Sequence, residues 1–152
     1  MKSEFSAGGV VIRRRTTQNN TQTNAEAIEV LVAYNGLYKA WVFPKGHIGD
    51  IKKGESKEEA AIREVKEETG VEAVIRSPLR PITYYFRIGK ETIRKTVHFF
   101  LMEFVSGDTE NHDYEMEEVR FVTIEKAMKM LKFKDEKEVL EEARQLLVKG
   151  KA

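Results

Sequence analysis

Three glutamates with helical spacing are the residues of this sequence that are best placed to do chemistry. Glu64, Glu67 and Glu68 lie within the segment 54–71, GESKEEAAIREVKEETGV. On a helix that turns by about 100° per residue, Glu67 and Glu68 fall within roughly 60° on either side of Glu64. The neighbouring arc, which would anchor such a helix in a core, holds Ala61, Ile62, Val65 and Thr69. The spacing therefore predicts a helix that presents three carboxylates beside its buried face.

Local electrostatics disfavour this grouping unless something positive compensates for it. Like charges three or four residues apart each cost roughly 0.2–0.5 kcal/mol, and Glu67 and Glu68 lie in the last turn, where the helix dipole prefers cations. Arg63 and Lys66 could compensate, in which case the segment is a solvated acidic face. A divalent cation is the sharper alternative, because Mg²⁺ takes oxygen ligands from one or two carboxylates together with substrate phosphates. A metal here would neutralise the glutamates and bind phosphoryl oxygens at once.

Local signals place this acidic helix and the elements around it. Ser56 is the expected N-cap, Glu59 completes a capping box and Gly70 marks the C-terminal stop, so the helix should run from about residue 57 to 69. Apolar stripes predict two further helices, one at about 124–131 and one after residue 135. Apolar runs predict strands at 5–13, 28–34, 73–76, 82–88, 96–105 and 119–123.

One of these strands indicates how the layers are arranged. Residues 97–104, VHFFLMEF, are apolar on both alternating faces, which is typical of a central strand covered on both sides. Strands mixed with helices on both faces predict a three-layer α/β/α sandwich. The polar segment 16–24, TTQNNTQTN, has no periodicity and is expected to be a mobile hairpin tip between the first two strands.

Length and composition narrow the class of protein. The chain has 152 residues, of which 41% are hydrophobic, so we expect one globular domain over residues 1–152. No apolar run approaches the roughly 18 residues of a membrane helix. The sequence has no cysteine, which excludes thiolate metal sites and cysteine nucleophiles and leads us to expect a cytoplasmic protein. The net charge of +1 predicts no general attraction to nucleic acid or membranes.

The residues around the acidic helix match a known sequence motif in addition to forming a charge pattern. Gly49, Glu55 and the run 63–71, REVKEETGV, match every fixed position of the Nudix box. Residues 41–47, WVFPKGH, and 93–101, IRKTVHFFL, are similar to the lead-in and the central strand of the diadenosine tetraphosphate hydrolase branch. The sequence therefore resembles the Nudix hydrolase family over nearly its whole length.

The resemblance implies a fold, a metal and a set of metal ligands. The fold would be the Nudix-type α/β/α sandwich with a mixed β-sheet, and the cofactor would be Mg²⁺, with Mn²⁺ as an alternative. The implied ligands are Glu64, Glu67, Glu68 and the backbone of Gly46, with Glu55 as a further ligand through water or as a residue that supports the ligands. In that branch one glycine usually serves both the Pro-Lys-Gly lead-in and the box. Gly46 and Gly49 are distinct in this sequence, so either of them could take the structural role.

The resemblance also implies catalytic and substrate-binding roles. Arg63 would orient the box carboxylates by charge-assisted hydrogen bonds. The general base would be a box glutamate or a late acid, for which Glu115 aligns best and Glu117 is the alternative. Phosphate contacts are expected from Lys45, His47 and Lys95. Stacking on a base is expected from Tyr84, Tyr85 or Phe121.

The implied reaction is hydrolysis of a nucleoside diphosphate linked to another group. The lead-in and central strand favour asymmetric cleavage of diadenosine tetraphosphate-type dinucleoside polyphosphates to a mononucleotide and a nucleoside triphosphate. Other Nudix substrates are the alternatives: an oxidised nucleoside triphosphate, the 5′-triphosphate end of RNA or a diphosphoinositol polyphosphate. A non-catalytic module that binds a nucleotide and regulates a partner is a hypothesis of another class. The expected ligand is a small nucleotide, and the chain could be a monomer or a homodimer.

Overall fold

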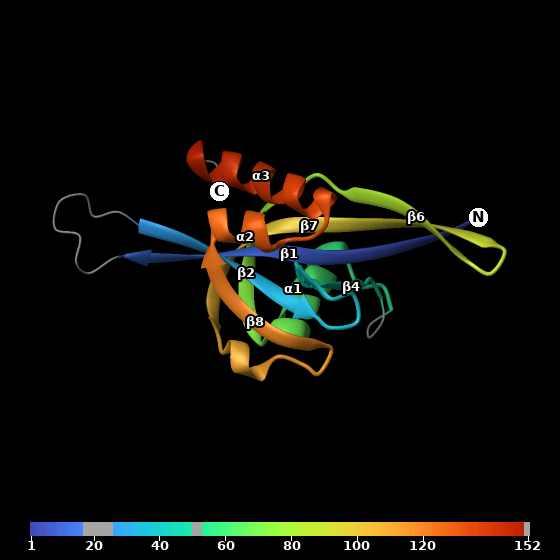
Figure 1. The fold of residues 1–152 in the computed structure, drawn as a ribbon, viewed down its shortest axis with the longest axis horizontal. Helices are drawn as coiled ribbons and strands as arrows, with labels where there is room; N and C mark the ends of the chain where they lie inside the picture. Colours follow the sequence, from blue (N-terminus) through green and yellow to red (C-terminus); the bar gives the residue numbers. More distant parts are fainter. Residues whose placement is uncertain (17–25, 50–52, 151–152) are drawn as a thin grey trace.

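The computed structural model describes residues 1–16, 26–49 and 53–150 of the chain (Figure 1). Apart from Thr16, the predicted polar hairpin tip lies outside the described residues. The strands are β1 Lys2–Thr16, β2 Glu26–Asn35, β3 Ala40–Val42, β4 Lys45–His47, β5 Val71–Pro78, β6 Ile82–Ile88, β7 Glu91–Gly107 and β8 Met116–Thr123. The helices are α1 Lys57–Thr69, α2 Ile124–Met130, α3 Lys134–Val148 and a short 3-10 helix, η1 Thr109–Asn111.

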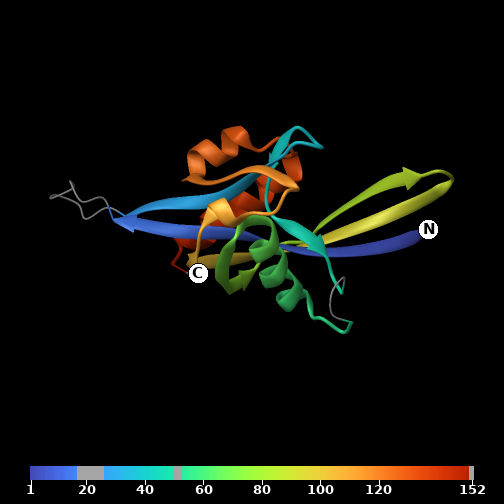
Figure 2. The same ribbon diagram turned by 90° about the horizontal axis from the view of Figure 1, so that it is seen from below.

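One mixed eight-stranded sheet forms the centre of the molecule. Its main order is β3-β2-β1-β7-β5, with β4 beside β1, β6 beside β7 and β8 beside β2. The central strands β1 and β7 run parallel, from the pair Lys2 and Ile93 to the pair Ile12 and Glu103. Helix α1 covers one face of the sheet, and α2 and α3 cover the other (Figure 1, Figure 2). The expected three-layer α/β/α sandwich with a mixed sheet is therefore confirmed.

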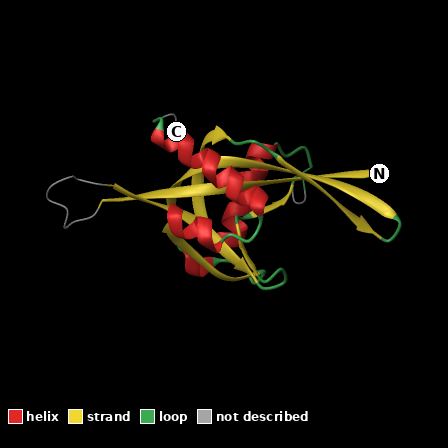
Figure 3. Cartoon of the chain, turned by 45° about the horizontal axis from the view of Figure 1, so that its top comes forward, coloured by secondary structure: helices red, strands yellow, loops and turns green. Residues whose placement is uncertain are grey.

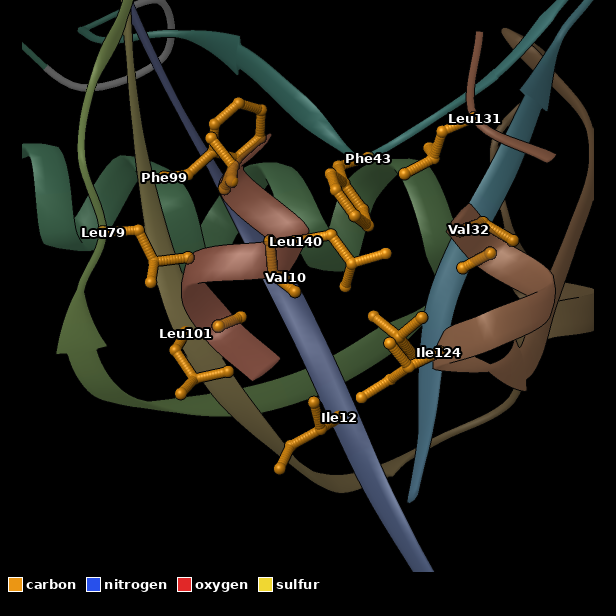
Figure 4. Close-up of a cluster of buried hydrophobic side chains, with 14 of the residues drawn as sticks. Val10, Ile12, Val32, Phe43, Leu79, Phe99, Leu101, Ile124, Leu131 and Leu140 are labelled. Atoms are coloured by element: carbon orange, nitrogen blue, oxygen red, sulfur yellow. The ribbon is translucent and has the colours of Figure 1, made fainter. Parts of the chain in front are cut away.

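Two hydrophobic cores fill the spaces on either side of this sheet. Leu140 of α3 belongs to the core shown in Figure 4, and Val65 of α1 belongs to the other. Strand β7 serves both, because Phe99 points into the first core and Phe100 into the second. Full burial of a side chain of this size is worth about 1.5–3 kcal/mol. The prediction of a central strand covered on both sides is confirmed.

Helix α1 has the boundaries that its local signals predict. Ser56 Oγ accepts a hydrogen bond from the Glu59 backbone N–H, and the Glu59 carboxylate accepts one from the Ser56 N–H, both at 3.0 Å. Gly70 ends the helix with a φ of 78°, a left-handed value that glycine adopts without strain. The helix is anchored on the sheet by Ala60, Ala61 and Val65, which are fully buried. This anchoring sets the rotation of α1 and thus the side on which its glutamates lie.

The structure differs from the sequence-based expectation in short strands and at strand ends. The three-residue strands β3 and β4 were not expected, because runs this short show no alternation and Pro44 lies between them. Strand β7 begins at Glu91, five residues before its predicted start, and pairs there with β6. The start of β1, β6 and the start of β7 together project from the body (Figure 3). No helix in the described part of the chain is long and apolar enough to cross a membrane.

Candidate active site

Arg63, in the middle of α1, gathers acidic side chains around one guanidinium group. Its Nε and Nη2 atoms donate to the two carboxylate oxygens of Glu55 at 2.6 and 2.9 Å. Its Nη1 atom donates to Glu67 at 2.9 Å and to Glu64 at 3.1 Å, and Nη2 also donates to the backbone oxygen of His47 at 3.1 Å. These hydrogen bonds, above all those with Glu55, raise the pKa of Arg63. Arg63 thus has the contacts expected of a residue that orients the box carboxylates.

A cavity of about 280 Å³ lies beside α1 and β4, and we call it the carboxylate lobe. Strand β4 reaches this cavity because its antiparallel pairing with β1 sets Gly46 opposite Ala7. The walls of the carboxylate lobe bring together these predicted site residues: Lys45, Gly46, His47, Glu64, Glu68, Lys95 and Glu115. Residues from β4, from β7 and from the segment before β8 therefore meet the carboxylates of α1 in one place.

Glu68 is a strongly perturbed carboxylate in this lobe. It is 7% exposed, and Glu64 is 8% exposed. Burial raises the pKa of Glu68 to about 8 from an ordinary value of 4.5, although the Lys45 backbone N–H donates to its Oε1 at 3.2 Å and opposes the rise. The charges of Glu64 and Asp113 raise that pKa further. A cation in the lobe would favour the ionised form, since an opposite charge stabilises a buried carboxylate.

Gly46 and Gly49 meet different structural requirements. A Cβ atom on Gly46 would collide with the carboxylate of Glu64, so a side chain at this position would displace that carboxylate. Gly49 has open space around it but a φ of 82°, and its N–H donates to Glu55 Oε1 at 3.0 Å. The glycine beside the carboxylates is therefore Gly46, and the glycine that makes the turn toward Glu55 is Gly49.

The oxygen donors of the carboxylate lobe fit a hard divalent cation. Mg²⁺ is usually held by one or two carboxylates together with water and substrate phosphates, and Glu64, Glu68 and the backbone of Gly46 offer such a set in one cavity. Glu55, Glu64 and Glu67 are all ion-paired with Arg63. Within the described ranges, no group of three or more His, Cys, Asp or Glu side chains is arranged to hold a metal ion. Glu64 and Glu68 line the lobe, and Glu67 shares the Nη1 donor of Arg63 with Glu64; the set of metal ligands that the resemblance implies stays a prediction.

A second cavity, of about 590 Å³, adjoins the first, and we call it the aromatic lobe. Its size is typical of a small-molecule site. Rings from β6, β7 and the residue before α3 line it, namely Tyr84, Phe86, Phe99 and Phe133. Tyr38, Lys45 and Lys95 line both lobes. The two lysines therefore stand where an anionic chain would pass from a ring-binding site to the buried carboxylates.

Phe121, predicted to stack on a base, lies in neither lobe. Its ring contacts Phe104 edge to face with centroids 5.6 Å apart, and the Arg13 guanidinium lies 4.0 Å from its centroid. Phe121 packs against the core under α1, so its apolar character is explained by packing. We therefore remove Phe121 from the candidate site.

The structure also separates the members of the other predicted pairs. Tyr84 lines the aromatic lobe, whereas Tyr85 points to the opposite side of the strand and is 60% exposed. Glu115 lines the carboxylate lobe, whereas Glu117 lies against the β2–β3 turn. His47 lines the carboxylate lobe with a side chain that is half exposed, and its Nε2 lies 3.6 Å from Glu4.

Several residues in the lobes were missed by sequence reasoning. Tyr38 is placed by a turn in which Asn35 Oδ1 accepts from the N–H groups of Leu37 and Tyr38 at 2.9 and 3.3 Å, and the Asn-Gly pair was a usable turn signal. Ser6 and Glu136 are buried polar residues that line the carboxylate and aromatic lobes, respectively. No local signal marks Glu136, because it lies in the charged run 134–138, KDEKE.

The fold and the two adjoining lobes define an α/β domain built around an acidic helix. A family model described as NUDIX domain matches residues 9–143. The chain therefore belongs to the Nudix family. The resemblance seen in the sequence is confirmed by this match, which covers most of the described residues.

Known relatives extend this assignment. The putative mutator protein MutT4 of Mycobacterium tuberculosis (strain CDC 1551 / Oshkosh) is 37% identical over 146 residues, which cover 96% of this chain and 56% of that protein. The asymmetrical bis(5′-nucleosyl)-tetraphosphatase of Sus scrofa is 33% identical over 146 residues, which cover 93% of this chain and 94% of that protein. This chain thus spans about half the length of the mycobacterial relative.

A solved structure supports the fold. The crystal structure of a C. elegans Ap4A hydrolase binary complex superimposes with a TM-score of 0.68 at 22% identity. The superposition covers 96% of this chain and 98% of that one. At this identity the likeness establishes the Nudix fold, and the substrate has to be argued from the site.

Proposed function

We propose that this protein is a metal-dependent hydrolase that cleaves diadenosine tetraphosphate-type dinucleoside polyphosphates asymmetrically, to a mononucleotide and a nucleoside triphosphate. The observation that carries the proposal is the pair of adjoining lobes, with buried carboxylates in one, aromatic rings in the other and two lysines in the walls of both. A nucleotide presents the matching groups in the same order, a flat base followed by anionic phosphates. The 33% identity to the pig enzyme over nearly its whole length supports the finer assignment of the substrate.

The carboxylate lobe would carry the chemistry. Glu64, Glu68 and the backbone of Gly46 would hold Mg²⁺, or Mn²⁺ in its place, and the bound ion would neutralise charge on the phosphates and lower the pKa of a water molecule. Glu115 would accept a proton from the attacking water. The water oxygen would bond to one phosphorus while the bridging P–O bond breaks and its oxygen leaves with the other product. Arg63 would keep Glu64 oriented through its hydrogen bond at 3.1 Å.

The aromatic lobe and the shared lysines would bind the rest of the substrate. Lys45 and Lys95 would neutralise the polyphosphate, and half-exposed His47 would reach a phosphate from the rim. Tyr84 and Tyr38 would stack on a base, a contact worth roughly 1–3 kcal/mol. Burial raises the pKa of the Tyr84 hydroxyl, so this ring stays neutral at physiological pH.

The test is a substrate panel with product analysis. The panel holds diadenosine tetraphosphate, ATP, 8-oxo-dGTP, 5′-triphosphate RNA and a diphosphoinositol polyphosphate, each with and without Mg²⁺. We expect the first to give equal amounts of AMP and ATP only with metal. We expect Glu64→Gln to lower this rate on the order of a hundredfold, and Glu58→Gln, at an exposed position of the same helix, to leave it unchanged. Faster turnover of another panel member would refute the substrate class, and no turnover of any would refute the activity.

An oxidised nucleoside triphosphate is the second candidate substrate. The aromatic lobe is a ring-lined cavity that could hold the base of a mononucleotide, and the 37% identical mycobacterial relative carries the name of a mutator protein. The discriminating measurement is kcat/KM for 8-oxo-dGTP against dGTP and against diadenosine tetraphosphate. A clear preference for the oxidised nucleotide over both would select this second candidate.

A further inference from the structure

Glu136, in the first turn of α3, holds a carboxylate oxygen that the fold leaves unused. The residue is 4% exposed. Its Oε2 accepts from the Phe43 N–H at 3.4 Å and lies 3.6 Å from Lys45 Nζ. Its Oε1 is buried and has no hydrogen-bond partner among the described residues. A buried polar atom without a partner destabilises the folded protein, so an oxygen kept in this state calls for a functional explanation.

The surroundings of this oxygen point to a ligand. Glu136 lines the aromatic lobe together with Tyr84, Phe86 and Phe133. Ring faces can hold a flat ligand by stacking, but stacking does not distinguish one base from another. A hydrogen-bond acceptor in the wall of such a cavity can make this distinction, because a base that lacks the matching N–H leaves the acceptor unpaired.

We propose that Glu136 is a specificity-determining residue that accepts a hydrogen bond, through Oε1, from an N–H on the edge of the nucleobase held in the aromatic lobe. This inference rests on the proposed nucleotide substrate. The matching chemistry is an exocyclic amino group, as on adenine, or the amino group of guanine. Since Oε2 is already engaged by Phe43 and Lys45, one N–H is the expected complement rather than a bidentate pair.

The contact with Lys45 supplies the competing explanation. If Glu136 only positions Lys45 toward the polyphosphate, removal of its carboxylate weakens the binding of all nucleotides equally. If Glu136 accepts a hydrogen bond from the base, the loss of affinity appears only for nucleotides whose base carries the N–H group. A cycle that changes both the protein and the ligand separates the two explanations, because a uniform phosphate effect cancels in the ratio.

The experiment compares the wild type with Glu136→Leu on paired ligands that differ in one amino group. Calorimetric titration uses AMP against purine riboside monophosphate, and GMP against IMP, so that no turnover is needed. We expect the wild type to discriminate about ten- to a hundredfold in one pair, and Glu136→Leu to reduce that ratio to about twofold or less. Affinity for the ligand that lacks the amino group should change little. The proposal would be overturned if Glu136→Leu lost affinity equally for both members of each pair, or if the wild type did not discriminate between them.

Stability measurements guard against a structural explanation. Leucine removes the unpartnered oxygen but also leaves the buried Phe43 N–H without its acceptor, so the ligand-free urea midpoint of Glu136→Leu should fall only moderately below that of the wild type, with the variant still folded. Glu138→Leu, the same substitution at an exposed position of α3, should keep both discrimination and binding. If Glu136→Leu fails to fold, the carboxylate is structural and the proposal is wrong. If the wild type discriminates in binding but hydrolyses nothing in the panel, the proposed activity fails while the assignment of Glu136 stands.

Discussion

Replacement of Glu68 by glutamine should change how the stability of the metal-free protein depends on pH. Burial raises the pKa of Glu68 in the folded protein to about 8, against 4.5 for an ordinary glutamate. Between these values the folded state binds a proton that the unfolded state has released, so the free energy of unfolding falls as pH rises. The contribution is fully present below about pH 4.5 and is lost by about pH 8.

The size of this effect follows from the difference between the two pKa values. One pKa unit corresponds to about 1.4 kcal/mol, so the whole window corresponds to about 5 kcal/mol and the interval from pH 5 to 8 to about 3–4 kcal/mol. Glutamine cannot ionise, and its Oε1 can still accept the hydrogen bond that the Lys45 N–H donates at 3.2 Å. The glutamine variant should therefore lack this part of the pH dependence.

Urea unfolding in EDTA at pH 5, 6.5 and 8 measures the effect. We expect the stability of Glu68→Gln minus that of the wild type to grow by about 3 kcal/mol across this series, while Glu58→Gln, exposed on the same helix, shows no such growth. Millimolar Mg²⁺ should raise the stability of the wild type most at pH 8 and that of Glu68→Gln little. A difference between variant and wild type that does not change with pH would refute the reasoning.

Three further predictions concern the same site. Gly46→Ala should abolish activity because the added Cβ collides with Glu64. Gly49→Ala should retain activity but lower the free energy of unfolding by about 1–2 kcal/mol, because its φ is positive. The hydrolysis rate and the urea midpoint of both variants test this prediction. Arg63→Lys should lower the free energy of unfolding by about 2–3 kcal/mol and kcat by at least about tenfold, because an ammonium group cannot replace the guanidinium N–H groups that bind several carboxylates. A variant as stable as the wild type would contradict this prediction. Tyr84→Ala should raise KM about tenfold and Tyr84→Phe should not, and equal KM values for the two variants would argue against stacking.

The acidic helix was predictable because the signals that define it are local. Ser56, Glu59 and Gly70 set its ends, and the apolar residues spaced along it select its buried face. The same spacing brings Glu64 and Glu68 to one side, whatever the rest of the chain does. Local chemistry of this kind is readable from sequence because it depends on contacts within three or four residues.

Contacts between distant segments were not predictable in the same way. Whether Gly46 or Gly49 faces the carboxylates depends on how β4 docks beside β1, and the pattern of residues is compatible with both. Phe121 was predicted beside the base but lines neither lobe, because an aromatic residue on a strand looks the same in the sequence whether it faces a core or a cavity. Glu136 reaches the N–H of Phe43 across 93 residues of chain, a separation at which no periodicity carries information.

The centre of the sheet joins parts of the chain that are made far apart in time. Lys2 pairs with Ile93 and Ile12 with Glu103, so β1 has no parallel partner until residues 93–103 have left the ribosome. Pairings this distant in sequence slow folding, because the chain must close a long loop before the contacts stabilise it. Until then the apolar side chains of Val10 and Val11 lack part of their cover, and apolar surface exposed during folding promotes self-association.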